Sequence, residues 1–225
     1  TPLTPEGEKD YESLRALDLK RLNKDLRALL TGKKVQLPRY DFLSGLSVDG
    51  ETAQLKKDDV IILEGIHGMN PDLLEGITPE ETFKIYVSCL TQLNLDRHNR
   101  ISTTDTRMLR RILRDARDRG YSAEDTIRRW ESVRKGESEH IFPYQENADV
   151  MFNSALAYEL TTLKPLVEPL LRQVRFGTRE HIEAKRLLKF LEWFLPTSTE
   201  YVPSNSLLRE FTGGSLLTNF SLWEH

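Results

Sequence analysis

A candidate for acid or metal chemistry is Glu64, which directly follows the aliphatic run from Val60 to Leu63. That run has four aliphatic residues, three of them β-branched, and predicts a short strand of a parallel sheet, buried on both faces. Open α/β sheets bind ligands beyond the carboxyl ends of their strands, where Glu64 would stand. A carboxylate there needs a cation or hydrogen-bond donors, because its burial is otherwise costly. Two interpretations stay open: a ligand of magnesium or substrate, and a structural partner.

A second candidate is an arginine-rich segment from Arg97 to Arg119, which holds eight arginines, three acids and no lysine. Its apolar residues recur at helical spacing, with Thr103 or Thr104 as a cap and Gly120 as the end. The planar guanidinium fork matches phosphate oxygens, so the bias toward arginine favours phosphate binding, whereas a solvated helix face is the alternative interpretation. The arginines are residues 97, 100, 107, 110, 111, 114, 117 and 119, of which 107, 111 and 114 share one face.

Three ring-bearing residues could contact a ligand. Tyr40 and Phe42 alternate along an extended segment and therefore face the same way, so they could pack beneath a loop or form a platform for a planar ligand. His67 stands three residues after Glu64, where its imidazole could meet a substrate or hold a loop by a structural hydrogen bond. The residue types alone leave each pair of interpretations open.

The elements that would position these residues follow from periodicity and from the glycine and proline residues. Strands are predicted over 83–89 and 148–152, and a hairpin or loop over 44–57. The arginine helix, a hinge at Gly120 and the next helix could form a mobile cover over a phosphate site or a static helical hairpin. Helices are predicted over 14–29, 103–119, 122–133, 156–171 and 179–195, the fourth broken by Pro165 and Pro169 and the last with Ile182 on its apolar side.

The composition excludes several classes of protein. The chain has 225 residues, of which 38% are hydrophobic and 30% charged, and its net charge of -3 provides no general attraction to nucleic acid or membrane. No apolar run approaches the roughly 20 residues of a membrane helix, and the single cysteine, Cys89, excludes a disulfide framework, so we expect a cytoplasmic location. The step from Gly32 to Lys33 lacks the neighbours of a phosphate loop, and the four histidines other than His67 do not pair with acids or each other at metal-ligand spacing.

Four motifs occur in the same order as in a known family. They are Tyr40-Asp41-Phe42, the stretch 60–67, the stretch 107–115 followed by Arg119-Gly120, and Ala148-Asp149-Val150. Together they resemble the uridine kinase/phosphoribulokinase family over the region from Tyr11 to Leu160. The resemblance implies an α/β fold, a three-layer P-loop-kinase-like parallel sheet with helices on both faces, here lacking the first strand and the P-loop. It also implies a kinase-like domain over residues 1–171 and a helical C-terminal extension over residues 172–225.

The resemblance assigns roles to individual residues. Glu64 would act on magnesium or its water, and Arg114 and Arg119 would reach the phosphates, so these three are the expected catalytic residues. The residues that would contact the acceptor are Tyr40, Phe42, His67 and Arg111. Gly45 stands where uridine kinases have a base-reading histidine, so the resemblance leaves the acceptor open. Tyr121 and Arg129, which replace an arginine and a glutamine near the acceptor, point the same way.

The activity that the resemblance implies is transfer of the γ-phosphate of ATP, with Mg²⁺ bridging the phosphates, to a hydroxyl of a nucleoside or sugar-phosphate-like acceptor. The family's P-loop and base aspartate precede the region that matches Tyr11, so we expect this chain to be an incomplete portion, inactive alone. The alternative is a non-enzymatic nucleotide- or RNA-binding regulatory module. Expected partners are ATP and a small-molecule acceptor, with no membrane, with nucleic acid disfavoured and with a homo-oligomer left open.

Overall fold

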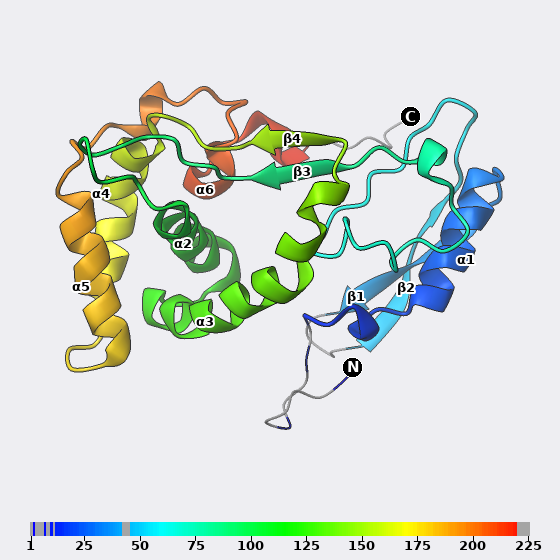
Figure 1. Cartoon of the computed structure of the whole chain (residues 1–225), viewed down its shortest axis with the longest axis horizontal. Coiled ribbons are helices and arrows are strands. Elements are labelled where there is room, and N and C mark those ends of the chain that lie inside the picture. The colour runs from blue at the N-terminus through cyan, green and yellow to red at the C-terminus, as the bar shows by residue number, and fades with distance from the viewer. Residues whose placement is uncertain (1, 3–6, 8–9, 11, 42–45, 220–225) are drawn as a thin grey trace. The chain divides into compact units, whose positions relative to one another are not determined.

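The computed structural model describes residues 2, 7, 10, 12–41 and 46–219 of the chain (Figure 1). The chain divides into two compact units. The first comprises Thr1–Tyr86 and Lys135–Val150, and the second comprises Val87–Arg134 and Met151–His225. The domain boundary expected between residues 171 and 172 falls inside the second unit and remains a prediction.

The described residues of the first unit include α1 (Leu19–Leu30), the strands β1 (Val35–Asp41) and β2 (Leu46–Ala53), and the end of a helix that begins in the second unit. The side chain of Asp18 accepts a hydrogen bond from the backbone N–H of Arg21 and thereby caps the start of α1. The strands of the hairpin pair antiparallel, with Tyr40 opposite Ser47. The hairpin or loop predicted over 44–57 is found only in part, because residues 46–53 form one strand of a hairpin whose other strand precedes that stretch. The pairing places the backbone of Tyr40 in a strand.

The run from Val60 to Leu63 is not a strand, so our expectation of a buried strand there is wrong. Val60 and Ile62 are 78% and 79% exposed, and the run belongs to neither of the two sheets that the described strands form. Apolar side chains do not make a strand by themselves, because the backbone N–H and C=O groups need a neighbouring chain as partner. Glu64 is exposed as well, so it does not carry the cost of a buried carboxylate.

A second pair of strands runs parallel, and it consists of β3 (Ile85–Ser88) and β4 (Val150–Asn153). The carbonyl of Lys84 accepts a hydrogen bond from the N–H of Val150, and the carbonyl of Ser88 accepts one from Ser154, so both strands advance in the same direction (Figure 1). The two strands confirm the mixed α/β class with a parallel sheet. The described strands pair only two by two, and the wider three-layer sheet remains an expectation.

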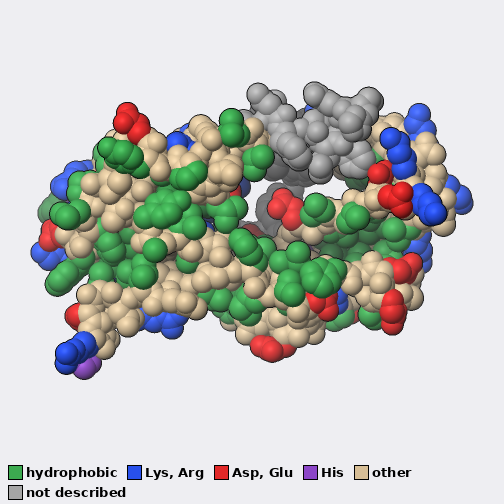
Figure 2. Space-filling view, turned by 90° about the horizontal axis from the view of Figure 1, so that it is seen from above, with side chains coloured by type: hydrophobic (Ala, Val, Ile, Leu, Met, Phe, Trp, Pro, Cys, Tyr) green, Lys and Arg blue, Asp and Glu red, His purple; other side chains and the backbone are tan. Residues whose placement is uncertain are grey.

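Hydrophobic side chains of the parallel pair are exposed. Ile85 and Val87 of β3 are 50% and 61% exposed, and Phe152 of β4 is 47% exposed. Figure 2 shows that hydrophobic side chains gather over much of the face that it presents. No helix in the described part of the chain is long and apolar enough to cross a membrane.

The second unit is built from helices around one apolar core. They are α2 (Thr103–Arg114), α3 (Ala123–His140, in this unit as far as Arg134), α4 (Glu159–Arg172), α5 (Arg179–Leu191) and the short α6 (Arg209–Thr212). Helix α4 packs against α2 and α5, and α6 packs against α2 (Figure 1). Leu109, Leu163 and Leu187 are fully buried between them. Each such leucine stabilises the fold by about 1.5–3 kcal/mol, so this core positions the arginine segment of α2 firmly.

The two prolines of α4 do not break the helix, so that prediction is wrong. Pro165 and Pro169 both lie inside α4. Proline has no N–H, and Pro165 therefore cannot bond to the carbonyl of Thr161. The backbone N–H of Thr197 donates to that carbonyl instead, at 3.0 Å, and so satisfies the group that the proline leaves free.

Helix α5 is shorter than the predicted helix, because it ends at Leu191 rather than at residue 195. Ile182 is 71% exposed, although it belongs to the apolar side in the sequence pattern, while Leu187 and Leu191 are fully buried. The helix packs on α4. Periodicity marks an apolar face but not how much of that face a neighbouring helix covers.

Candidate functional site

The buried carboxylate of Asp115 holds two of the predicted site arginines. Its Oδ2 atom accepts hydrogen bonds from Nε of Arg111 and Oγ1 of Thr126, both at 3.1 Å. Its Oδ1 atom accepts a hydrogen bond from Nη1 of Arg119 at 2.9 Å. The Asp115 side chain is 4% exposed, whereas those of Arg111 and Arg119 are 31% and 45% exposed. The carboxylate therefore fixes two guanidinium groups that remain accessible to an anion.

A π-helical turn follows the α-helix at Asp115, and both arginines lie four residues from this acid along the chain. Helix α2 continues without a break into the π-helical segment Asp115–Arg119, which ends at Gly120. Gly120 has a φ of 67°, a left-handed conformation that suits glycine, and the N–H groups of Gly120 and Tyr121 both bond to the carbonyl of Asp115. The sequence predicted the helix and its glycine end. It carried no signal for the π turn, a feature that recurs at functional sites.

Arg114 is engaged by the C-terminal part of the chain. Its Nη1 atom donates to Oε1 of Glu210 in α6 at 2.9 Å. The side chains are 31% exposed for Arg114 and 55% exposed for Glu210. The Nε atom of Arg114 is buried and has no hydrogen-bond partner within the described ranges. A phosphate that approaches Arg114 would therefore meet a guanidinium already paired with an acid.

Arg117 also donates hydrogen bonds to carboxylate and carbonyl oxygens. It donates to both carboxylate oxygens of Asp118, each at 2.7 Å, and to the backbone carbonyl of Glu210 at 2.5 Å. The hydrogen bond from Arg117 lowers the pKa of Asp118, and the same contact raises the pKa of Arg117. The half-buried Arg114 and the exposed Arg117 thus contact the same residue of α6.

Arg110 has a structural role. It is 8% exposed, and its guanidinium donates to Oε2 of Glu159 at 2.6 Å and to the carbonyl of Ser154 at 2.7 Å. Its Cζ atom also lies 5.0 Å from the ring centroid of Phe211. Because Glu159 is itself only 2% exposed, the arginine is the partner that this buried acid requires. Arg110 is therefore not available to a ligand.

Tyr121 and Arg129, the two departures from the family pattern near the acceptor, contact each other. The Cζ atom of Arg129 lies 4.2 Å from the ring centroid of Tyr121. A hydrogen bond with the Tyr121 hydroxyl raises the pKa of Arg129. A guanidinium over a tyrosine ring gains a cation–π attraction, which holds the two side chains together.

Of the predicted site residues of the first unit, the structure describes the side chains of Glu64 and His67, which differ in exposure. Glu64 is exposed, whereas His67, three residues later, is 6% exposed and packs edge-on against His140 with ring centroids 5.2 Å apart. Burial lowers the pKa of His67, and the charge of His140 lowers it further. Tyr40 lies in β1, but its side chain and the whole of Phe42 lie outside the described residues.

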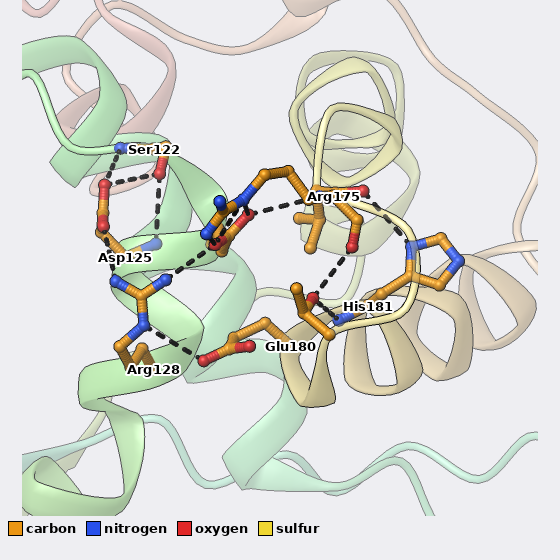
Figure 3. A network of polar contacts seen from close by, with 9 residues as sticks. Ser122, Asp125, Arg128, Arg175, Glu180 and His181 are labelled. Carbon is orange, nitrogen blue, oxygen red and sulfur yellow. Dashed lines mark hydrogen bonds and ion pairs between the residues drawn. The ribbon is translucent and has the colours of Figure 1, made fainter.

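The first turn of α3 carries a polar network that the sequence predicted in part (Figure 3). The hydroxyl of Ser122 accepts a hydrogen bond from the N–H of Asp125 at 3.1 Å and donates to its Oδ2 atom at 2.6 Å. This is the expected cap. Arg128 then donates to Oδ1 of Asp125 at 3.1 Å and to Oε1 of Glu180 at 3.2 Å, which ties α3 to α5.

Glu124 and Arg175 complete this network, and sequence reasoning missed them. Nε of Arg175 donates to both Glu124 oxygens, at 3.0 and 3.1 Å, and its Nη2 atom also donates to Oε1. The hydrogen bonds from Arg175 lower the pKa of Glu124 to about 2. The partners are 51 residues apart, so no local pattern could have paired them.

The described residues fit a phosphate group better than a metal ion. Arg111 and Arg119 supply exposed, fixed N–H donors of the kind that bind phosphate oxygens. No group of three or more His, Cys, Asp or Glu side chains within residues 12–41 and 46–219 could hold a metal ion. Because Mg²⁺ takes several oxygen ligands, Glu64 by itself does not form a magnesium site.

Comparison with known proteins identifies the family. The model of the Phosphoribulokinase / Uridine kinase family matches residues 4–160. Uridine kinases of Staphylococcus aureus strains JH9, Newman and MW2 are each 31% identical over 162 residues, which covers 70% of this chain and 70% of each relative. The chain therefore belongs to the phosphoribulokinase/uridine kinase family, as the order of its motifs predicted.

Proposed function

We propose that this chain is part of an ATP-dependent kinase of the uridine kinase/phosphoribulokinase type. The reaction transfers the γ-phosphate of ATP to a hydroxyl of a nucleoside or sugar-phosphate-like acceptor. The observation that supports it best is the pair Arg111 and Arg119, which one buried carboxylate, that of Asp115, holds in place while both side chains stay partly exposed. In a family of kinases, fixed arginines of this kind are suited to phosphate oxygens.

The arginines would act by stabilising charge. In phosphoryl transfer the acceptor oxygen bonds to the γ-phosphorus, the bond to the β-phosphate oxygen breaks, and negative charge develops on the oxygens around phosphorus. Donors that are fixed before the reaction stabilise that charge without reorganising. We assign Arg114 and Arg119 to the ATP phosphates and Arg111 to the acceptor side. Asp115 then supports two of these three residues.

The remaining assignments stay proposals. We propose that Glu64 acts on magnesium together with groups outside the described residues, and that Tyr40, Phe42 and His67 contact the acceptor. The residues that form the contact between Tyr121 and Arg129 differ from the family pattern, which favours an acceptor other than uridine. The three-layer sheet, the P-loop and a cytoplasmic location belong to the same proposal. Because residues 1–225 contain no phosphate-loop pattern, we expect them to be inactive alone.

The alternative is a non-enzymatic nucleotide- or RNA-binding module. One observation favours it: no phosphate-loop pattern occurs in this sequence. Exposed arginines would then bind phosphates without transfer, and binding of single-stranded RNA would weaken steeply with salt.

The test is ADP release with Mg-ATP by the 225-residue chain and by a fusion of this chain to the P-loop segment of a uridine kinase relative. Nucleosides and sugar phosphates serve as acceptors. Acceptor-dependent release by the fusion only, lost on Arg119→Ala and kept on Arg172→Ala, supports the kinase. Arg172 is exposed and lies outside the arginine segment, so it controls for loss of one charge. Salt-sensitive RNA binding, without ADP release in the presence of any acceptor, would favour the binding module.

A further inference from the structure

The C-terminal segment, residues 199–213, contacts three residues of the arginine segment: Arg110, Arg114 and Arg117. Glu210 pairs with Arg114 through its side chain and with Arg117 through its backbone carbonyl, and the Phe211 ring lies under Arg110. These contacts come from α6, which lies beyond residues 4–160, the region that matches the family model. The segment therefore lies outside the region that matches the family model, and it contacts Arg114, which we assign to the ATP phosphates.

The backbone of this segment is firmly anchored. The guanidinium of Arg209 donates to the carbonyls of Thr199 at 3.1 Å and Gly213 at 3.3 Å, and also to that of Val202. Leu208, next to Arg209, is fully buried in the apolar core of the second unit. Gly213 follows α6 with a φ of 82°, so the chain turns sharply there. The anchors do not depend on the side chain of Glu210.

The ion pair itself is exposed and weak by comparison. Glu210 is 55% exposed and offers one negative charge, and pairs of this kind contribute little to stability. A diphosphate or triphosphate offers more charge and more oxygens to the same guanidinium. The buried Nε of Arg114, unpartnered among the described residues, would gain an acceptor if the guanidinium turned toward such a ligand. The carboxylate can thus be displaced without unfolding the segment.

We propose that Glu210 is a built-in competitor that occupies Arg114 until a phosphate ligand displaces it. The inference rests on the proposed function, in which Arg114 contacts the ATP phosphates. A ligand that must first displace an internal carboxylate binds with a lower apparent affinity, because only the fraction of Arg114 that is unpaired can bind it. The C-terminal segment therefore raises the phosphate concentration at which the site fills.

The test measures binding of inorganic pyrophosphate to the 225-residue chain by isothermal titration calorimetry. Glu210→Gln should tighten binding about two- to five-fold, the range that an exposed ion pair supports. Glu200→Gln is the matched control, because Glu200 is an exposed acid of the same region and its loss changes the net charge equally. The affinity of this control for pyrophosphate should change by less than that of the Glu210→Gln variant. In an Arg114→Ala background, Glu210→Gln should have no effect.

The outcomes separate this inference from the proposed function. If the unaltered chain binds pyrophosphate and Glu210→Gln binds it equally or more weakly, the competitor is refuted and the phosphate site stands. If both substitutions tighten binding equally, the effect is one of net charge and the inference also fails. If neither the unaltered chain nor Glu210→Gln binds pyrophosphate, the arginine site itself is refuted. Equal melting temperatures of the two variants show that the fold is kept.

Discussion

The Oδ1 atom of Asp115 accepts a hydrogen bond from Nη1 of Arg119 at 2.9 Å, across one π-helical turn. The same carboxylate holds Arg111 from the preceding α-helical turn. One acid thus orients two guanidinium groups, one from the residue four positions before it and one from the residue four positions after it. The geometry makes Asp115 the residue on which the candidate phosphate site depends.

Asp115→Ala should destabilise the fold and weaken the binding of phosphate. The substitution removes three hydrogen bonds and leaves two arginines without their acid. We expect a loss of about 2–3 kcal/mol in the free energy of unfolding, less than for a fully buried pair because both arginines are partly exposed. Urea denaturation measures it. Asp118→Ala, at an exposed acid of the same segment, should leave the urea midpoint nearly unchanged; an equal loss in both variants would contradict the role of Asp115.

Gly120→Ala should destabilise the chain through backbone strain alone. The φ of Gly120 is 67°, and an added Cβ would meet no atom within 4 Å, so no clash contributes. The left-handed conformation costs a residue with a Cβ about 1 kcal/mol. Gly136→Ala in the interior of α3 should instead stabilise by about 0.5–1 kcal/mol, because alanine favours helix. Thermal unfolding of both variants tests the contrast, and shifts of the same sign would argue against it.

Acid should weaken the attachment of α3 to the connection between α4 and α5 through Glu124. The pKa of Glu124 falls from 4.5 to about 2 because Arg175 donates hydrogen bonds to it. A lowered carboxylate pKa stabilises the folded state above pH 4.5, and this contribution is lost as the pH falls toward 2. The urea concentration at the unfolding midpoint should therefore fall less steeply from pH 5 to pH 2 in Glu124→Gln than in the unaltered chain, because the variant lacks the titration of this carboxylate. Parallel pH profiles would remove this ion pair from the acid response.

His67 should be neutral in the folded chain at neutral pH. Burial and the neighbouring His140 lower its pKa below 6.5, against smaller opposing contributions from Glu12 and Asp10. The unfolded chain then binds a proton more readily than the folded chain, so stability falls as the pH drops below 6.5. NMR titration of the imidazole protons measures this pKa directly. A value for His67 above that of an exposed histidine such as His98 would contradict the buried environment.

Local signals in the sequence predicted much of the second unit. The cap at Ser122, the end at Gly120 and the apolar stripe of the arginine helix are each contained within a few residues, and the structure confirms them. The clustering of arginine indicated a shared face for residues 107, 111 and 114 but did not pair Arg111 with Arg119, which meet the same acid, Asp115. These features depend on propensity and periodicity, which short stretches of sequence carry.

Features that depend on distant partners could not be predicted. The run from Val60 to Leu63 has the composition of a strand but no strand beside it in the described residues, so it stays unpaired. Arg114 meets Glu210 across 96 residues, and Thr197 satisfies the carbonyl that Pro165 leaves free in α4. In each case the outcome depends on which segment lies next to which, and one sequence does not contain that information.

The central claim is that the arginine segment binds phosphate through arginines that Asp115 orients. Isothermal titration of pyrophosphate into the 225-residue chain tests it most directly, with Arg119→Ala as the probe and Arg172→Ala as the control for net charge. We predict that Arg119→Ala weakens binding about five- to ten-fold, the loss of one charge-assisted contact, and that Arg172→Ala changes it less than two-fold, within about the range of surface charge effects. Equal affinities of the unaltered chain and Arg119→Ala, or no binding of pyrophosphate at all, would contradict the account.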